Sequence, residues 1–547
     1  ASGVSHNVFS EYSVGEEGLI NNNSSATFSN QQTISHLTGS YLPINPHLSG
    51  PGARIILSEV TGPSVSFLRG PVEIYGQRAD YILSNPHGIY VNGTHFINTN
   101  RITLSTGTPY YDSASAFSGL CVERGKIVLR SMGLATSQVP LIGSPLFIIS
   151  RVAELSAEIQ TTDEVNVYTG LHSFDYISKT VKPSEKAVAE RPHLAIDASC
   201  LGKVESGKIT LIATERGVGV RAPEHLVSQD AVTVNVSGPL HLPKSIETAG
   251  DLDIKSESPL KLLGTSLIAS GSLYLSGASL LIDDSSHVLF RGISCPGKAS
   301  MSLKACTSLE NGGNVSSEGG ALLIDVGSLK NNQELSSSGC ISIKSKGHVI
   351  NGGILRASKA LSFSGPSLEN TGSIVSESAD ISLNSISADQ ITSLAWGSHM
   401  IKRIGSLTTS GTVTSTLNQK LTAISLKNIS NLESKKGHLQ LQLASFLRND
   451  GTVHSGDTLS IVSGALIVNQ GDLSSLNALD IMSQRLESGG VIGSGWGTLS
   501  LYASESLQNT NLLVSGGNLQ VDSGGLYTNQ GETYACGDLS LSSKRLI

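Results

Sequence analysis

Apolar and polar residues alternate in short runs along residues 53–109. The runs Ile55–Leu57, Val72–Tyr75 and Tyr81–Leu83 are rich in β-branched or aromatic residues, which is typical of strands. Turn pairs such as Gly62-Pro63 and Gly70-Pro71 separate these runs. No apolar pattern with a period of 3.6 residues continues for more than one helical turn in this stretch. The pattern predicts an all-β chain built from short strands.

From about Ile246 the pattern becomes a repeat with a period of just under 20 residues. Each repeat has an Asn-Gly-type turn followed by an alternating pair such as Leu459 and Ile461, or Leu479 and Ile481. Ser410 and Ser488 occupy the turn position in two repeats where asparagine is absent. Asparagine occupies it in the others: Asn311, Asn331, Asn351, Asn370, Asn449, Asn469, Asn509 and Asn529.

A repeat of this length cannot enclose a core by itself, so neighbouring repeats have to stack. Alternation with period 2 sends every second side chain inward, and parallel strands stacked about 4.8 Å apart then bury one aliphatic column. Glycine and serine interrupt the repeats too often for a helix. The LxxLxLxxN pattern of leucine-rich repeats is absent. We therefore predict a right-handed parallel β-helix of about 20 residues per coil.

Stacking also explains the recurring asparagines. Each coil places its turn residue over that of the coil below, so the side-chain amides can form a hydrogen-bonded ladder. Asparagine also tolerates the left-handed backbone conformation that turns often need. The eight asparagines named above are therefore predicted to have a structural role.

Composition narrows the function classes. The 547 residues carry a net charge of −7 without a basic block, which argues against nucleic acid as a partner. No run of 18 apolar residues is present. The cysteines are scattered without a CxxC pair, so we expect most of them to be small buried side chains: Cys121, Cys200, Cys295, Cys306, Cys340 and Cys536.

Candidate catalytic and metal-binding residues do not form a recognisable pattern. The acidic doublets Glu16-Glu17 and Asp283-Asp284 are followed one period later by no further carboxylate. The histidines lack HxH or HxxxH spacing, and no phosphate-binding glycine loop is present. We expect no catalytic residues, no metal and no cofactor.

Two Asn-Pro turns provide the most specific motif of the first half. Pro is suited to the second position of a type I turn. The turns are Asn45-Pro46-His47-Leu48 and Asn85-Pro86-His87-Gly88, the latter followed by Ile89. Together with the opening segment 3–22, the block from Glu59 to Gly93 and the segment from Ala195 to Arg221, they resemble the secretion domain of two-partner-secretion exoproteins. The nearest members are the filamentous haemagglutinins and the contact-dependent growth-inhibition proteins of Gram-negative bacteria.

This resemblance implies a secretion domain over residues 1–245 and haemagglutinin-type β-helical repeats over residues 246–547. It implies a capped N-terminal domain. The segment from Thr161 to Arg191 is polar, and it is expected to form an extra-helical hairpin or a loop excursion. The expected partner is a cognate outer-membrane β-barrel transporter with periplasmic peptide-binding domains. The two Asn-Pro turns are the expected recognition residues, so Asn45→Ala or Asn85→Ala should reduce secretion and leave the purified protein folded.

The resemblance further implies signal-peptide removal, export to the cell surface or medium, and repeats that present an adhesive or toxin-delivering distal region to a host or target-cell receptor. Two alternatives stay open at this point. Parallel β-helices also include polysaccharide-degrading enzymes, and haemolysins share the same secretion domain.

Overall fold

The computed structural model describes residues 3–26, 34–48, 50–130, 133–134, 143–184, 190–198, 200, 202–292, 300–378, 381–384 and 406–547. All regular secondary structure in these ranges is β-strand, and none of it forms a helix suited to crossing a bilayer. The chain divides into two compact units, residues 1–277 and 278–547. The boundary predicted from sequence, at residue 245, stays a prediction.

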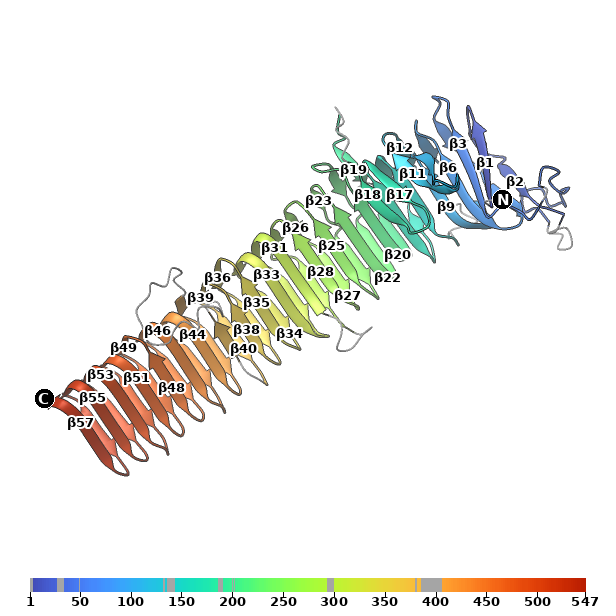
Figure 1. Cartoon of the computed structure of the whole chain (residues 1–547). Coiled ribbons are helices and arrows are strands. Elements are labelled where there is room, and N and C mark those ends of the chain that lie inside the picture. Colours follow the sequence, from blue (N-terminus) through green and yellow to red (C-terminus); the bar gives the residue numbers. More distant parts are fainter. Residues whose placement is uncertain are drawn as a thin grey trace. The chain divides into compact units, whose positions relative to one another are not determined.

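The second unit is a stack of parallel coils (Figure 1). In its last third, long strands alternate with short ones: β51 (Leu479–Ser488), β52 (Val491–Ser494), β53 (Leu499–Asn509) and β54 (Leu512–Ser515). β51 pairs in parallel with β53, and β52 with β54, so each strand lies one coil from its partner. The predicted parallel β-helix of about 20 residues per coil is confirmed.

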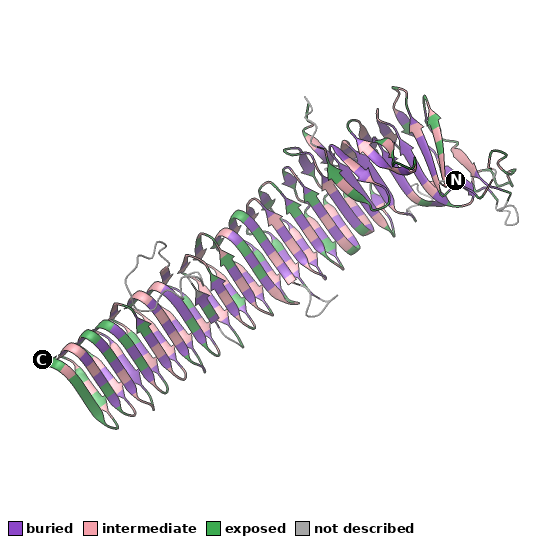
Figure 2. Ribbon diagram, viewed as in Figure 1, coloured by how far each residue is buried: buried purple, intermediate pink, exposed green. Residues whose placement is uncertain are grey.

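Side chains alternate between the interior and the surface of each coil, as Figure 2 shows for the bands of buried and exposed residues. Leu479 and Ile481 point inward and stack on Leu499 and Leu501 of the next coil, while Asp480 between these rows and Met482 after them are exposed. Burial of each leucine or isoleucine contributes about 1.5–3 kcal/mol. The aliphatic column is therefore the main source of stability in the coils.

The first unit starts coiling at its first strand. β1 (Val4–Phe9) pairs in parallel with β3 (Ile55–Val60), which pairs with β6 (Ala79–Ser84). The stack continues from β6 to β9 (Thr99–Ser105) and on to β13 (Leu146–Ser150). The residues after β1 continue the first coil, since Val14 bridges Leu68 and β2 (Leu19–Asn23) pairs in parallel with β5 (Val72–Gly76), and the excursion from the coil therefore begins only after Asn23.

The segment between β2 and β3 is attached to a small parallel sheet that consists of β2, β5 and β8 (Phe96–Ile97). The attachment point is Glu73 of β5, which is buried. Its carboxylate accepts hydrogen bonds from the Ser35 hydroxyl at 2.7 Å and from the main-chain N–H groups of residues 36 and 37 at 2.8 and 3.2 Å. These three donors compensate for the desolvation of the charge.

A four-stranded antiparallel sheet lies outside the coils. It consists of β10 (Thr108–Tyr111), β11 (Phe117–Val122), β17 (His172–Asp175) and β18 (Thr180–Pro183). The hairpin expected between Thr161 and Arg191 is therefore present, but it starts only at His172. The hairpin of β10 and β11 was not predicted.

The first part of the expected excursion belongs to the coil. β16 (Glu164–Thr169) pairs in parallel with β13 and with β20 (Lys203–Ala213), and most of its side chains are buried. Its sequence, Glu-Val-Asn-Val-Tyr-Thr, is less polar than the residues that follow, and this was the available signal.

The prediction that most cysteines are buried is wrong for the residues described. None of the five described cysteines is buried, and all five are free thiols: Cys121, Cys200, Cys306, Cys340 and Cys536. Cys295 lies outside the described residues. In the coils the inward rows are filled by leucine, isoleucine and valine, which leaves cysteines such as Cys306 outside these rows, whereas Cys121 lies in β11 of the antiparallel sheet.

Candidate functional site

The turn at Asn85 is held by its own asparagine side chain. The amide nitrogen donates to the Ser64 carbonyl oxygen at 3.0 Å and to the Ser66 hydroxyl at 2.9 Å. The amide oxygen accepts the His87 main-chain N–H at 2.9 Å, and the Gly88 N–H closes the turn on the Asn85 carbonyl at 3.0 Å. Asn85 is fully buried, so its contacts in the folded unit are structural.

Glycine is required at the fourth position of this turn. Gly88 has φ of 124°, and a Cβ atom there would lie 3.1 Å from the Lys126 carbonyl oxygen. The next residue, Ile89, begins β7 (Ile89–Val91) and is buried. The turn therefore passes the chain from β6 into the next face of the coil.

The turn at Asn45 has the same construction at a more exposed position. Its amide oxygen accepts the His47 N–H at 2.9 Å, and the Leu48 N–H donates to the Asn45 carbonyl at 3.2 Å. Its amide nitrogen donates to the Asn22 carbonyl at 2.8 Å, which attaches the turn to β2. The two turns thus hold different parts of the first unit: Asn45 binds the small sheet, and Asn85 binds the segment that enters β4 (Ser66–Leu68).

The third residue of each turn contributes its main-chain N–H. The side chain of His47 is exposed, and the buried Nδ1 of His87 has no hydrogen-bond partner among the described residues. Pro46 is exposed and Pro86 is half-buried. The side chains that the folded turns need are therefore the two asparagines.

The asparagines of the repeats form hydrogen-bonded columns. Asn311 donates to Asn331 at 2.8 Å, Asn331 to Asn351 at 2.8 Å, and Asn351 to Asn370 at 2.7 Å. A second column joins Asn428, Asn449 and Asn469, and a third joins Asn509 to Asn529. Asn428, absent from the sequence-based set, occupies this position too.

Two coils interrupt these columns. Asn370 pairs with Thr409, so Thr409 and not Ser410 holds the position in that coil. An insertion between β41 (Ile381–Asn384) and β42 (Ser406–Thr409) shifts the count by one and explains the error. In the second interruption Ser488 lies between Asn469 and Asn509, as expected from the sequence.

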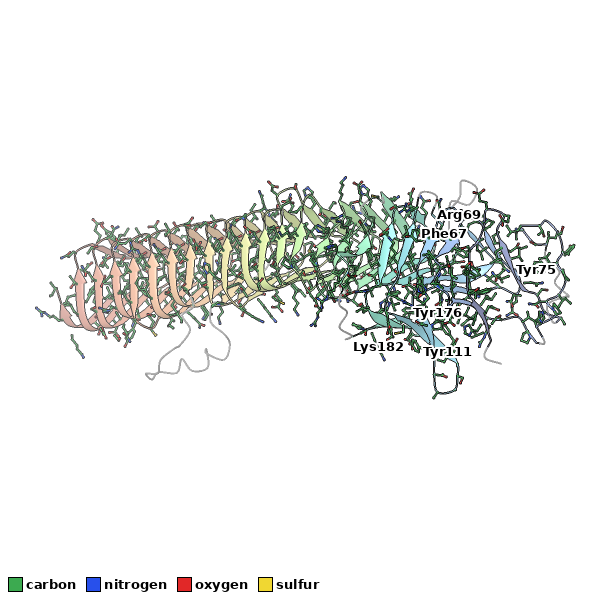
Figure 3. All side chains as sticks on the ribbon, turned by 90° about the horizontal axis from the view of Figure 1, so that it is seen from above. Phe67, Arg69, Tyr75, Tyr111, Tyr176 and Lys182 are labelled. Atoms are coloured by element: carbon green, nitrogen blue, oxygen red, sulfur yellow. The ribbon has the colours of Figure 1, made fainter. Side chains whose placement is uncertain are left out.

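The outer sheet is joined to the coils by a junction that the sequence did not reveal. The Tyr176 hydroxyl donates to Asp80 at 2.9 Å, and the Arg101 guanidinium lies 4.4 Å from the centre of the Tyr176 ring and 3.7 Å from Asp80. Burial and the neighbouring Asp80 charge raise the pKa of Tyr176 well above its usual value. Figure 3 shows Tyr176 with Tyr111 and Lys182 on this side of the unit.

A buried histidine lies at the base of the same sheet. His172 donates from Nδ1 to the Gly170 carbonyl at 2.9 Å, and its Nε2 has no partner among the described residues. Burial lowers the pKa of His172 to about 4, so the ring is neutral at pH 7. The sequence carried no signal for this environment, because the strands that cover the histidine come from distant segments.

Within the described residues, no group of three or more His, Cys, Asp and Glu side chains is arranged to hold a metal ion. The acidic residue of the doublet at 283 caps its own turn, since Asp283 accepts from the Ser285 and Ser286 hydroxyl groups at 2.9 and 2.5 Å.

Comparison with known families identifies the domain in which these turns lie. Residues 1–242 match the TPS secretion domain. Haemagglutinin repeats match residues 307–353, 319–395, 436–494 and 496–547. The chain belongs to the two-partner-secretion exoproteins. This assignment is favoured over the alternative of a polysaccharide-degrading β-helix.

The sequence identities to individual proteins are consistent with this family assignment. The chain is 32% identical over 288 residues to the 16S rRNA endonuclease CdiA of Enterobacter cloacae, covering 52% of this chain and 8% of that protein. It is 29% identical over 287 residues to the filamentous hemagglutinin of Bordetella pertussis, covering 51% of this chain and 7% of that protein. The aligned part is thus less than a tenth of each relative's length.

One solved structure is also similar, the crystal structure of a filamentous hemagglutinin secretion domain. It is 26% identical, with a TM-score of 0.41, and the alignment covers 56% of this chain and 91% of that one.

Proposed function

We propose that residues 1–245 of this two-partner-secretion exoprotein are recognised by a cognate outer-membrane β-barrel transporter with periplasmic peptide-binding domains. The observation that supports this best is the match of residues 1–242 to the TPS secretion domain, in which both Asn-Pro turns lie. The recognition residues are Asn45, Pro46, His47, Leu48, Asn85, Pro86, His87, Gly88 and Ile89. After signal-peptide removal the chain crosses the periplasm and outer membrane and reaches the cell surface or medium.

The transporter reads these turns before the unit folds. Asn85 is buried in the folded unit, so its side chain is accessible to another protein only in an unfolded or partly folded chain. Folding outside the cell then starts at β1, since the first coil closes when β3 pairs with β1. Each added coil buries apolar area at about 25 cal/mol per Å², which can drive export without a nucleotide site.

The experiment is co-expression of the chain and its cognate transporter with a signal peptide, and measurement of the secreted fraction. We expect Asn45→Ala to lower secretion, with Ile44→Ala, at an exposed residue just before the turn and outside the recognition residues, as the matched control. Loss of secretion in the absence of the transporter is also expected. Normal secretion of Asn45→Ala and Asn85→Ala would contradict the recognition role of the turns.

We propose that the repeats present an adhesive or toxin-delivering distal region to a host or target-cell receptor. This proposal is supported by the similarity of the chain to a filamentous hemagglutinin and to CdiA nucleases. The 547 residues themselves are not the enzyme in this proposal, because they align with less than a tenth of each named nuclease. Purified chain should therefore leave 16S rRNA and tRNA intact, and cleavage of either would contradict this.

A further inference from the structure

Two asparagines of the columns are followed directly by glycine. The pairs Asn311-Gly312 and Asn351-Gly352 lie in coils of the second unit, and both asparagines are fully buried. Asparagine is a chemically labile residue, and it is most labile before glycine, which has no side chain to hinder ring closure. These two pairs therefore combine a reactive dipeptide with an enclosed position in the coil.

The reaction open to such a pair is deamidation. The main-chain nitrogen of the glycine attacks the asparagine Cγ, and the new N–Cγ bond closes a succinimide ring. The Cγ–Nδ2 bond breaks, and ammonia leaves with the proton of the glycine N–H. Water then opens the ring at one of its two carbonyl carbons, which yields aspartate or isoaspartate. The reaction thus needs an unbound glycine nitrogen, a side chain that can turn, and access of water.

The folded coil removes all three requirements at Asn351. The Gly352 N–H donates to the main-chain carbonyl of Asn331 at 2.8 Å, so this nitrogen is already bound. The Asn351 amide nitrogen donates to Oδ1 of Asn370 at 2.7 Å, and its Oδ1 accepts from Asn331 at 2.8 Å. The side chain is also shielded from solvent. Ring closure therefore has to wait until the coil opens locally.

Asn311 is held in the same way at the other end of this column. The Gly312 N–H donates to the Ile282 carbonyl at 2.7 Å. The Asn311 amide nitrogen donates to Oδ1 of Asn331 at 2.8 Å, and its Oδ1 accepts the Gly313 N–H at 3.3 Å. At both pairs, contacts to the adjacent coils supply the protection, so it exists only after these coils have stacked.

We propose that Asn311 and Asn351 are deamidation sites of the unfolded chain that folding closes, and that deamidation in turn prevents the coil of Asn351 from forming. An ionised aspartate at position 351 cannot donate to Asn370, and it places a carboxylate among buried groups. Isoaspartate adds a main-chain atom and disturbs the strand pairing of the residues that follow.

The two pairs thus limit how long the chain can stay unfolded and still form these coils. This inference depends on folding alone. It can hold or fail independently of the transporter recognition proposed above.

The turn at Ser410 provides a matched comparison within the same unit. The Gly411 N–H donates to the Asn370 carbonyl at 3.0 Å, as the Gly352 N–H does to that of Asn331. Ser410 is exposed and lies outside the column. The variant Ser410→Asn therefore creates an Asn-Gly pair that keeps the main-chain bond but lacks the buried side-chain contacts.

Peptide mapping by mass spectrometry measures deamidation in the 547-residue Ser410→Asn chain at mildly alkaline pH, folded or denatured in guanidinium chloride. In the denatured chain, positions 311, 351 and 410 should react at similar rates. Folding should slow positions 311 and 351 by about 100-fold or more, and position 410 by at least about ten-fold less than that. Equal rates at position 351 in the folded and denatured chains would overturn the proposal. A position 410 as slow as 351 would overturn the role of the column.

Asn351→Asp tests the effect of the product, with Asn351→Ser as the control, because Ser488 shows that a column position accepts serine. Hydrogen exchange of β36 (His348–Asn351) and β39 (Ser367–Asn370) is the measurement. Asn351→Asp should lose protection at about pH 7 and regain it at about pH 4, where a buried carboxyl is protonated and can donate again. Asn351→Ser should show no such pH dependence. Native protection of Asn351→Asp at about pH 7 would overturn the claim that deamidation prevents this coil from forming.

Discussion

The asparagines of the two Asn-Pro turns have different surroundings, and they therefore contribute differently to the stability of the first unit. Asn45 and Asn85 make the same turn, but Asn85 is fully buried and also holds the segment at Ser64 and Ser66. The sequence predicted equal roles for the two residues, because the four-residue turns look alike. The difference depends on the tertiary position of each turn, which the local sequence does not contain.

Asn85→Ala should therefore destabilise the first unit as well as reduce secretion, contrary to the expectation from sequence alone. Removing the amide leaves the buried Ser66 hydroxyl without its donor, at a cost of about 1–3 kcal/mol, and also frees the half-buried Ser64 carbonyl. Hydrogen exchange of β6 and β7 in the purified variant measures the effect. Asn45→Ala, at a more exposed turn, should cost less, and equal protection of the two variants would show that burial does not distinguish them.

The stability around the outer sheet should depend on the charge of His172. The unfolded histidine takes up a proton near pH 6.5 and the folded one only near pH 4, so the unfolded chain binds more protons between these values. Stability should be unaffected above pH 7 and fall as the pH drops from about 6.5 to 4, by up to about 3 kcal/mol. Exchange protection of β11 and β17 should follow this change.

His172→Gln provides the control for that titration, since glutamine keeps a donor for the Gly170 carbonyl but does not titrate. The difference in pH dependence between the native chain and the variant isolates the histidine from the carboxylates that titrate over part of the same range. An identical pH dependence in both proteins would assign the acid sensitivity to other groups.

At the scale of elements, the asparagine columns show how far a repeat can be interpreted from sequence. The coil length and the inward rows followed from the spacing of leucine and asparagine, because stacking forces equivalent positions into register. The residue at 409 was misplaced by one, since an insertion changed the spacing without changing the coil. The position of a residue within its coil is fixed by strand pairing. The number of residues between equivalent positions varies from coil to coil, so counting along the sequence gives only an average.

Thr409→Asn should join two of these columns. The Asn428 amide oxygen is buried and has no hydrogen-bond donor among the described residues, and Thr409 lies directly below it in register. An asparagine there can donate to Asn428 and accept from Asn370, so we expect the coil to gain about 0.5–1.5 kcal/mol. The free energy of local opening of β42 and β44 (Gln419–Asn428), from hydrogen exchange, measures it.

Ser410→Asn is the matched control for this prediction. It adds the same side chain one residue away, outside the column, and should leave exchange unchanged. A stabilisation by Ser410→Asn equal to that of Thr409→Asn would mean that the column position has no special role.

The outer sheet is the element that the sequence predicted least well. Its β17–β18 hairpin was anticipated from polarity, but β11 combines apolar and small residues with a largely buried pattern similar to that of coil strands. Phe117, Leu120 and Phe174 are buried together with Phe147 of the coil, and these contacts join segments far apart in the chain. A local pattern identifies a strand, but it does not identify which surface the strand will cover.

At the scale of the whole chain, protection should differ from coil to coil. β57 (Leu539–Leu546) pairs with β55 (Leu519–Asn529) on one side, and Leu539 and Leu541 are about half exposed. In the 547-residue chain, hydrogen exchange should be fastest beyond Asn529 and slowest in coils such as that of Leu459 and Ile461, which have neighbours on both sides. Uniform protection through Leu541 in a monomeric sample would contradict this.

The interleaving of the outer sheet with the coils has a consequence for timing. Strand β11 pairs with β17, but residues 123–171, which include the coil strands β13 and β16, lie between them in the chain. When the chain is exported from its N-terminus, one edge of β11 has no hydrogen-bonding partner, and its apolar face stays uncovered, until β17 has also been exported. The length of that period is set by the rate of export. Slower export would therefore lengthen the lifetime of the incomplete sheet. Its unpaired edge could then pair with a strand of another molecule before β17 is available.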